Sequence, residues 1–558
     1  MRVPIVVGLL LAVLPLRTSN AQNDTTIAAI DRIFDRYRGT STPGCAIGAG
    51  RNGEVLLTRA YGMANLETGT PNTSETIFHA ASLAKQVTAM ATMLLVREGK
   101  LSLDDDIRRW LPELPAYGHT ITVRHLLTHT SGLRDYIELL IFARGRFEED
   151  RITHADFLDI LARQKSLNFS PGTAYGYSNT GYALLALLVQ RVSGQSLRDF
   201  ARERIFEPLA MTSTQFRDDV TALVPGRATG YAERDGAWRL SEPNYDVYGP
   251  TNLLTTVGDL LRWLDNFAHP TVGDSAIVRQ MATRAVLANG DSTDYGFGLG
   301  QTRFWGPLVL EHEGSDPGFR AWSGHFPRER LSLAVLCNTR SANAVSLGHD
   351  VAEVYLGDEH RPSPPYPAVT PDGPVDSMAG QRYAGVYFEP SRVEVLELSW
   401  REGTLYTRPR GGRRLLPVGP GRFQLEGFPI LYTFGPNPHS DVVASSLEPG
   451  HHPTTFEWRA TNRVTPRPRE VYTGEFFSQE LNATYHISVD DSTISLRVGS
   501  APPVRFQPAF QDTFTAGQLT VEFMRRGNRV TGFLLSHPRA LRIRFVRRGV
   551  RADASLSR

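Results

Sequence analysis

Apolar residues near the start of the chain are spaced first as in a helix and then as in strands. A helix is predicted over 24–37, where apolar residues recur every three to four positions along one face. Apolar runs over 45–50 and 55–58 then flank Asn52-Gly53. Asn-Gly is a preferred two-residue hairpin turn, so these runs predict two paired strands.

The spacing becomes helical from Ser82 to about residue 300. One helix is predicted over 82–99 and another over 182–194. Strand-like runs return over 308–312 and 331–336, and a last helix follows. Strands at both ends of a helical middle predict one sheet that is assembled from both ends of this segment.

The pattern changes again beyond residue 358. Six prolines within thirteen residues predict a stiff, extended linker; they are Pro362, Pro364, Pro365, Pro367, Pro371 and Pro374. Short alternating strands with turns follow. The segment Tyr383-Ala-Gly-Val-Tyr-Phe388 recurs as Tyr472-Thr-Gly-Glu-Phe-Phe477, 89 residues later (472 − 383). We therefore predict two related small antiparallel β-barrels.

The amino terminus has the features of a secretory signal peptide. Arg2 precedes a twelve-residue apolar run over 5–16, and Ser19-Asn-Ala21 places small residues at positions −3 and −1 of a cleavage site. Twelve apolar residues are too few to span a bilayer, and no other stretch of the sequence approaches the necessary length. We expect a periplasmic or secreted protein without stable membrane insertion.

Composition and charge exclude some functions. The 60 basic and 58 acidic residues give a net charge of +2, and no basic stripe is interleaved with aromatic residues. Nucleic acid is therefore not an expected partner. Zinc patterns such as His-Glu-x-x-His are absent from the sequence, and we expect no metal and no other cofactor.

Lysine is rare in this chain, which makes the position of one lysine informative. Only Lys85, Lys100 and Lys165 are present, against 57 arginines (60 − 3). Lys85 follows Ser82 by three residues, so that on a helix its amine and the hydroxyl share a face. Unlike arginine, a buried lysine can lose its proton and act as a base. Ser-x-x-Lys also recurs by chance, as a helix cap followed by a solvated lysine.

Two further candidate motifs follow in the chain. Tyr177-Ser-Asn179 comes after the turn-forming Ser-Pro-Gly at 170–172 and directly before a predicted helix. His312-Glu-Gly-Ser315 ends a predicted strand, where a glycine at an edge lets a substrate backbone approach closely. Tyr177 could instead be a packing aromatic, and His312 an ordinary strand histidine. The three motifs in this order indicate one catalytic site.

With these motifs, residues 27–357 resemble the serine β-lactamase and penicillin-recognising superfamily. The relevant branch contains class C β-lactamases, D-alanyl-D-alanine carboxypeptidases, D-aminopeptidases and related esterases. The resemblance implies an α+β fold, with an antiparallel β-sheet flanked by helices and an all-helical subdomain. It rests on Ser82-x-x-Lys85, Tyr177-Ser-Asn179, His312-x-Gly314 and the family-like stretches 124–133 and 252–263.

The predicted organisation has five parts, and a catalytic domain followed by two barrels is similar to bacterial D-aminopeptidases. The parts are a signal peptide (1–21), a β-lactamase-like serine hydrolase domain (22–358), a proline-rich linker (359–378) and β-barrel domains over 379–464 and 465–558.

The two cysteines, Cys45 and Cys337, lie in the segments that would form the first and last strands of the catalytic sheet. In the resembling family these strands run close together. Export would permit a disulfide. Neighbouring strands rarely offer good disulfide geometry, which favours two buried free thiols.

The resemblance also implies a mechanism. Ser82 would form an acyl-enzyme, Lys85 would be its base, and Tyr177 would relay a proton to the leaving group. The backbone N–H groups of Ser82 and Ser315 would form the oxyanion hole, worth about 3 kcal/mol per donor. Asn179 would hydrogen-bond the amide side chain of the substrate.

The third motif departs from the Lys-Thr-Gly that is usual in β-lactamases. His312 would hydrogen-bond Tyr177 or substrate without being a fixed charge. Glu313 stands where relatives that bind a C-terminal carboxylate have a hydroxyl residue. A second carboxylate beside it would cost several kcal/mol, so penicillins and D-Ala-D-Ala termini should be disfavoured against neutral esters or substrates with a free amine. Arg320 could instead neutralise Glu313 as a structural pair.

Three functions remain open on the sequence. The first is an exported serine hydrolase that acts on D-amino-acid peptides, amides or small esters. The second is a β-lactamase or D-alanyl-D-alanine carboxypeptidase, and the third is a non-catalytic cell-wall binding or sensor protein. The presence of Ser82, Lys85 and Tyr177 argues against the third. The expected partner is a small-molecule or short-peptide substrate, with peptidoglycan-derived material as one candidate.

Overall fold

The structure is a computed structural model, and most of the predicted signal peptide and of the proline-rich linker lie outside its described residues. No helix within the described ranges is long and apolar enough to cross a membrane. The ranges are 17–145, 150–304, 306–357, 377–408, 412–426, 430–435, 443–446, 454–460, 471–490 and 493–549.

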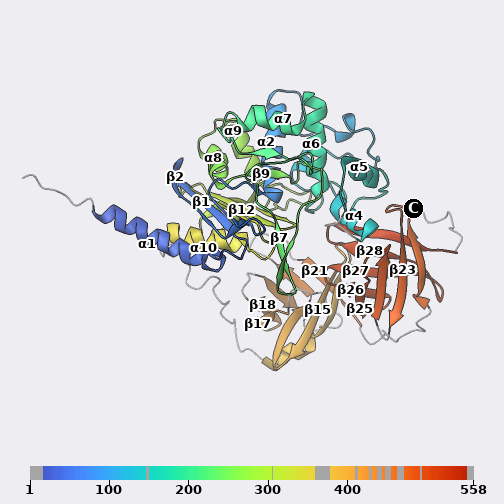
Figure 1. Ribbon diagram of the computed structural model, residues 1–558. Helices are drawn as coiled ribbons and strands as arrows, with labels where there is room; N and C mark the ends of the chain where they lie inside the picture. The colour runs from blue at the N-terminus through green and yellow to red at the C-terminus, as the bar shows by residue number, and fades with distance from the viewer. Residues whose placement is uncertain are drawn as a thin grey trace, which may run out of the picture.

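A six-stranded antiparallel sheet forms the centre of the catalytic domain (Figure 1). Its strand order is β10-β11-β12-β13-β1-β2, so strands from the two ends of the domain meet where β13 pairs with β1. This confirms the sheet predicted from both ends. The strands are β10 (Gly300–Arg303), β11 (Leu308–Asp316), β12 (Phe319–Phe326), β13 (Leu331–Cys337), β1 (Cys45–Arg51) and β2 (Glu54–Tyr61).

Helices cover both faces of this sheet, which explains why β13 is buried throughout and apolar at every position except Ser332. Leu333 and Val335 belong to the core beneath α10 (Ala344–Leu356) and α1 (Arg17–Ile33). The intervening Ala334 and Leu336 belong to the core under α8 (Val257–Ala268). Successive strand side chains point to opposite faces, so burial on both faces needs a continuous apolar run.

The helical part lies beside the sheet and carries the predicted helices. The 82–99 segment forms a 3₁₀ turn, η2 (Ala81–Leu83), followed by α2 (Ala84–Arg97). Helix α6 (Asn179–Ser193) ends at Gly194, whose φ of 77° is the left-handed conformation that glycine adopts readily. The other helices are α3 (Val123–Leu127), α4 (Tyr136–Arg144), α5 (His154–Ala162), α7 (Leu197–Ala201) and α9 (Ser275–Met281).

Short pieces connect these elements. The small strands are β3 (Met63–Asn65), β4 (Thr70–Pro71), β5 (Phe78–His79), β6 (Gln215–Phe216), β7 (Tyr231–Arg234), β8 (Ala237–Leu240) and β9 (Leu253–Thr255). The remaining turns are the 3₁₀ helices η1 (Asp35–Tyr37), η3 (Ile107–Arg109) and η6 (Ser377–Tyr383) and the π-helix η4 (Arg202–Phe206).

Two closed eight-stranded barrels follow, as predicted. The first comprises β14 (Gly385–Glu389), β15 (Glu394–Arg401), β16 (Thr404–Arg408), β17 (Arg414–Gly419), β18 (Arg422–Leu425), β19 (Leu431–Phe434), β20 (Val443–Ser446) and β21 (Thr454–Arg459). The second comprises β22 (Gly474–Ser478), β23 (Ala483–Asp490), β24 (Thr493–Val498), β25 (Val504–Phe510), β26 (Thr513–Ala516), β27 (Leu519–Arg526), β28 (Arg529–His537) and β29 (Ala540–Arg547).

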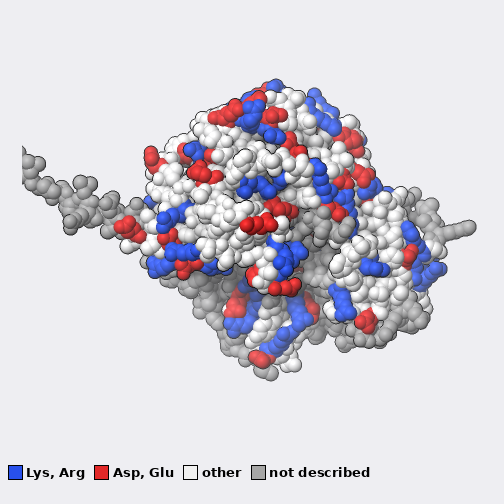
Figure 2. Space-filling model, in the orientation of Figure 1, with Lys and Arg blue, Asp and Glu red and all other residues white. Residues whose placement is uncertain are grey.

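The second barrel packs directly on the catalytic domain, and its interior apolar residues are continuous with that domain's core. Arg134 and Glu480 form an ion pair at 2.8 Å across this interface, with both side chains buried. Tyr485 Oη donates to the carbonyl of Phe142 at the end of α4. Figure 2 shows basic and acidic residues interspersed over the face of the catalytic domain in view, in keeping with the small net charge.

The expectation of two free thiols was wrong. Cys45 on β1 and Cys337 on β13 form a disulfide bond. The two residues are directly opposite in the antiparallel register, with Cα atoms 4.0 Å apart. A closely spaced cross-strand pair brings the two sulfur atoms together, and this register could not be read from either strand alone.

Candidate active site

Ser82 lies in the η2 turn at the start of α2, where strand β11 packs against it. Gly314 on β11 makes this packing possible, since a Cβ atom there would lie 2.5 Å from the carbonyl oxygen of Ala80. The glycine was predicted to admit a substrate backbone. In the structure it admits the backbone of the turn that carries Ser82.

Lys85 is fully buried and lies against Ser82. Its Nζ is 3.1 Å from Ser82 Oγ, 2.8 Å from Asn179 Oδ1 and 2.8 Å from the carbonyl oxygen of Pro250. The last two atoms can only accept hydrogen bonds. A neutral amine has two N–H donors and one lone pair, so both donors are used and the lone pair faces the Ser82 hydroxyl.

The orientation of the Asn179 amide is fixed by Asp135. Asn179 Nδ2 donates to Asp135 Oδ2 at 2.9 Å, and Asn179 N donates to the same oxygen at 2.8 Å. The other carboxylate oxygen, Oδ1, accepts from Ile137 N at the start of α4. A carboxylate accepts only, so the amide nitrogen must face Asp135 and the amide oxygen must face Lys85. Asn179 thus has a contact with the base that the sequence did not indicate.

The surroundings of Lys85 favour the neutral amine. Burial lowers the pKa of Lys85 to about 7, against the raising effects of Asp316 and Asp135, and the positive charge of Arg539 lowers it further. Desolvation penalises the charged form of an amine. A lysine with this pKa is a competent base near neutral pH.

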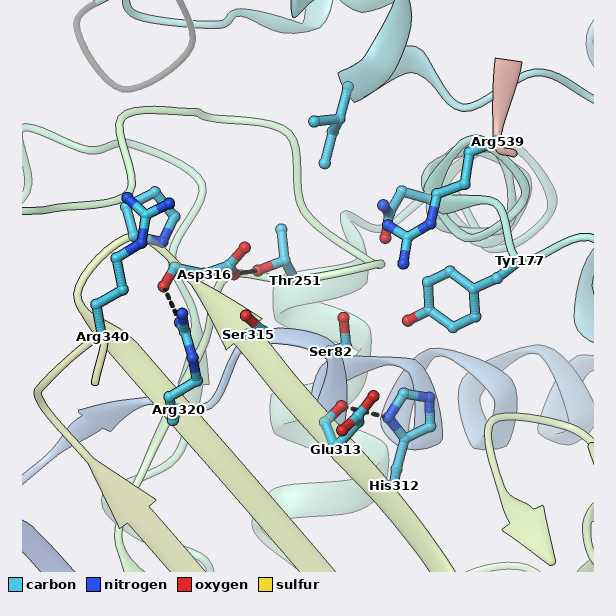
Figure 3. Close-up of a pocket in the computed structure, with 13 residues that line it drawn as sticks. Ser82, Tyr177, Thr251, His312, Glu313, Ser315, Asp316, Arg320, Arg340 and Arg539 are labelled. Atoms are coloured by element: carbon cyan, nitrogen blue, oxygen red, sulfur yellow. Dashed lines mark hydrogen bonds between the residues drawn. The ribbon is translucent and has the colours of Figure 1, made fainter. Parts of the chain in front are cut away.

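Tyr177 points its phenol toward Ser82 (Figure 3). Burial raises the pKa of Tyr177 well above its usual value, although hydrogen bonding with Ser82 opposes this. Tyr177 is therefore a protonated phenol at neutral pH. It can donate a proton and be reprotonated through Lys85, whose Nζ lies 4.8 Å from the centre of its ring.

The family-like stretch 124–133 holds the loop that carries Tyr177. The carbonyl of His129 accepts from Gly176 N at 2.9 Å, and that of Thr130 accepts from Gly172 N at 2.8 Å. The ring Nδ1 of His129 accepts from Ser178 N at 3.1 Å. Burial lowers the pKa of His129 well below its usual value, so the ring is neutral and can accept this bond.

His312 contacts a tyrosine other than the expected one. Its Nε2 is 2.8 Å from the hydroxyl of Tyr295, and its Nδ1 donates to the carbonyl of Glu313 at 2.6 Å. Because Nδ1 carries the proton, the Tyr295 hydroxyl donates to Nε2. Burial lowers the pKa of His312 to about 3, so this position is uncharged, as the sequence predicted.

These groups line one cavity of about 490 Å³, within the range of small-ligand sites. Ser82, Tyr177, Asn179, His312 and Glu313 contribute to its wall. Ser315 on β11 also lines it and lies near Ser82 in Figure 3. Within the described ranges no group of three His, Cys, Asp or Glu side chains could hold a metal ion.

Comparison with known proteins agrees with this geometry. Residues 30–356 match the family described as Beta-lactamase. The chain belongs to the beta-lactamase family. Penicillin-binding protein 4* of Bacillus subtilis is 30% identical over 412 residues, which is 69% of this chain and 86% of that protein. A D-aminopeptidase of Cereibacter sphaeroides is 26% identical over 551 residues, 94% of this chain and 99% of that protein.

The fold has close solved counterparts. The octameric penicillin-binding protein homologue of Pyrococcus abyssi superimposes with a TM-score of 0.54 at 21% identity, covering 87% of this chain and 99% of that one. This likeness shows the fold. The family match and the D-aminopeptidase relative identify the protein as a beta-lactamase-related serine hydrolase.

The structure distinguishes between the two expectations for Glu313 in this serine hydrolase. Glu313 is exposed and makes no ion pair with any residue that the structure describes. Arg320, the candidate for its counter-ion, donates from Nη1 to the carbonyls of Asp316 and Phe319 at 2.9 and 2.7 Å. Two unexpected arginines also line the cavity: Arg340, and Arg539 of the second barrel.

Three contributors to the site were not found from the sequence. Asp135 orients Asn179, Tyr295 donates to His312, and Arg539 lies with its guanidinium 4.9 Å from the centre of the Tyr177 ring. None of them belongs to one of the three motifs. Asp135 had one usable signal, because it lies just after the family-like stretch 124–133 and directly before a helix.

Proposed function

We propose that this serine hydrolase cleaves amides and short peptides of D-amino acids with a free amine, through an acyl-enzyme on Ser82. The observation that carries this proposal is the Lys85 amine, buried at 3.1 Å from Ser82 Oγ with both of its neutral-state donors already used. The relative named D-aminopeptidase, which aligns over 94% of this chain, supports the substrate class.

Acylation uses three proton transfers. Ser82 Oγ attacks the carbonyl carbon while its proton passes to Lys85 Nζ. The amide C–N bond then breaks, the Tyr177 phenol protonates the departing nitrogen, and Lys85 returns its proton to Tyr177. The backbone N–H groups of Ser82 and Ser315 hold the oxyanion.

Water completes the reaction. It attacks the ester carbonyl, loses a proton to Lys85, and releases the acid as Ser82 regains a proton. His312 is neutral and hydrogen-bonded to Tyr295, so it adds a polar side chain to the cavity wall without a positive charge. Glu313 supplies a carboxylate that favours a substrate ammonium. Neutral short-chain esters fit the same chemistry, and benzylpenicillin is disfavoured because it has no free amine to face Glu313.

Export through a cleaved signal peptide belongs to this proposal. The apolar run at 5–16 and the small residues before position 22 support it. The Cys45–Cys337 disulfide also supports it, because disulfides persist in oxidising compartments.

The experiment is active-site labelling followed by a substrate comparison. Intact mass spectrometry after a fluorophosphonate probe should give one adduct that Ser82→Ala removes. The purified protein should then hydrolyse D-alanine p-nitroanilide with a higher kcat/KM than benzylpenicillin. An unlabelled protein, or one that turns over the penicillin fastest, would overturn the proposed function.

A further inference from the structure

The hairpin between β28 and β29 carries one arginine of the second barrel to the catalytic cavity. The main-chain carbonyl of Arg539 accepts from Asp135 N at 2.9 Å and from Asn168 Nδ2 at 3.1 Å. Leu541 N donates to Asn168 Oδ1 at 2.8 Å. The catalytic domain thus holds this hairpin by its backbone and fixes where the Arg539 side chain begins.

The guanidinium of Arg539 forms no hydrogen bond or ion pair with any residue in the described part of the chain. The side chain is exposed, lines the cavity and lies over the Tyr177 ring (Figure 3). An arginine presents five N–H donors in a planar fork that matches a carboxylate. All of these donors are available to a ligand.

The nearby acidic groups do not neutralise this charge. The Asp135 carboxylate is occupied by Asn179 and Ile137. Glu138 on α4 lies 3.6 Å from His537. Burial raises the pKa of Glu138 to about 7; Asp135 raises it further and Arg539 lowers it, so near neutral pH this carboxyl is only partly ionised.

Glu313 supplies an opposite charge in the same cavity, which Asp316, Arg320 and Arg340 also line. In the view of Figure 3 its carboxylate and the Arg539 guanidinium lie on opposite sides of the Ser82 hydroxyl. Opposite charges on two sides of a nucleophile complement a dipolar ligand. Arg539 lies over Tyr177, the group that protonates the leaving nitrogen in the proposed reaction, and therefore on the leaving-group side.

We infer that Arg539 binds the carboxylate of the leaving amino acid in a short peptide whose free amine faces Glu313. This rests on the proposed function and narrows its substrate class to zwitterionic D-dipeptides and peptides of similar length. It revises the expectation that D-Ala-D-Ala termini are disfavoured, because Arg539 of the second barrel lines the same cavity as Glu313.

Binding to the full-length Ser82→Ala protein tests this without turnover. Isothermal titration calorimetry would compare D-alanyl-D-alanine with D-alanyl-D-alaninamide, which differ only in the terminal carboxylate. We expect the dipeptide to bind at least about tenfold more tightly, since a charge-assisted bidentate contact contributes that much. Adding Arg539→Gln should remove the preference, and adding Arg539→Glu should reverse it in favour of the amide.

Arg529→Gln is the matched control, because Arg529 is an exposed arginine at the other end of β28. It should leave the ratio of the two affinities unchanged. If Arg539→Gln weakens both ligands equally or neither, or if the dipeptide does not bind measurably, the inference is overturned. Fluorophosphonate labelling of the wild-type protein tests the proposed hydrolase function separately from the role of Arg539. Labelling depends on Ser82 and requires no substrate carboxylate.

Discussion

Asn179 Oδ1 accepts a hydrogen bond from Lys85 Nζ at 2.8 Å, and Asp135 determines that it is the oxygen that faces the lysine. The amide is uncharged, so it orients the lysine without adding a counter-charge. Burial lowers the pKa of Lys85 to about 7.

Asn179→Asp tests this arrangement with almost no change in shape. A carboxylate beside Nζ favours the ammonium form, so the pKa of Lys85 should rise. The base works only when deprotonated, and the rise of kcat/KM with pH should therefore move to higher pH by at least one unit. A pH–rate profile on D-alanine p-nitroanilide measures this. If the pH–rate profile of a folded variant is unchanged, the group whose titration controls kcat/KM is not Lys85.

Lys85→Arg should abolish turnover, although it keeps a positive charge in the site. Arginine cannot accept the Ser82 proton, and loss of a general base costs at least about a hundredfold in kcat. Stopped assays at high enzyme concentration would measure the residual rate. Retention of more than about a tenth of kcat would contradict the role given to Lys85. Lys165→Arg, at an exposed contact with Gln479, is the matched control.

Glu313→Gln should reduce the preference for a free amine. The exposed Glu313 carboxylate lines the cavity, and removing its charge should lower kcat/KM for D-alanine p-nitroanilide about tenfold. The N-acetyl form of the same substrate carries no ammonium and should change less than twofold. Equal losses for the two substrates would mean that Glu313 does not contact the amine.

Glu480→Gln should destabilise the docked second barrel. It leaves Arg134, whose side chain is 2% exposed, without its ionic partner. Removing one member of a buried ion pair costs about 3–5 kcal/mol. Thermal unfolding should show a clear fall in Tm, whereas Lys165→Ala, at the exposed Gln479 contact of the same interface, should have little effect. Equal Tm values for both variants would show that the buried pair does not hold the domains.

Reduction of the disulfide should lower stability without removing the site. Cys45 and Cys337 are 292 residues apart in sequence, and cross-links of long loops stabilise by about 2–5 kcal/mol. Dithiothreitol should therefore lower the Tm of the wild-type protein. The double variant Cys45→Ser, Cys337→Ser should start at the lower Tm and not respond. A wild-type Tm that is unaffected by full reduction would contradict this.

Local signals were sufficient for much of the fold. Gly194 ends α6 where the apolar spacing stops, and the repeated Tyr-x-Gly segments open the two barrels. Lys85 could be identified because it is an isolated lysine among arginines, three residues after a serine. Lysine can lose its proton and act as a base there, whereas arginine cannot. In each case the determining residues are neighbours in the sequence.

The remaining features depend on contacts between distant segments. The disulfide requires the register of β1 against β13, and Gly314 acquires its role only when η2 packs on β11. Arg539 reaches Tyr177 only through the docking of a barrel that follows the catalytic domain by more than a hundred residues. No local spacing encodes such docking, so the charge of the cavity could not be predicted from its motifs alone.

Three successive hydrogen bonds connect the carbonyl of Arg539 in the second barrel to the amine of Lys85. The carbonyl accepts from Asp135 N, the Asp135 carboxylate holds Asn179, and Asn179 holds Lys85. Synthesis runs from the amino terminus, so Ser82 and Lys85 exist long before residue 539 is made. A nascent or prematurely ended chain therefore contains Ser82 and Lys85 but lacks the carbonyl of Arg539 that accepts from Asp135 N. The hydrogen-bonded support of Lys85 is therefore complete only once the last barrel has been made and has docked.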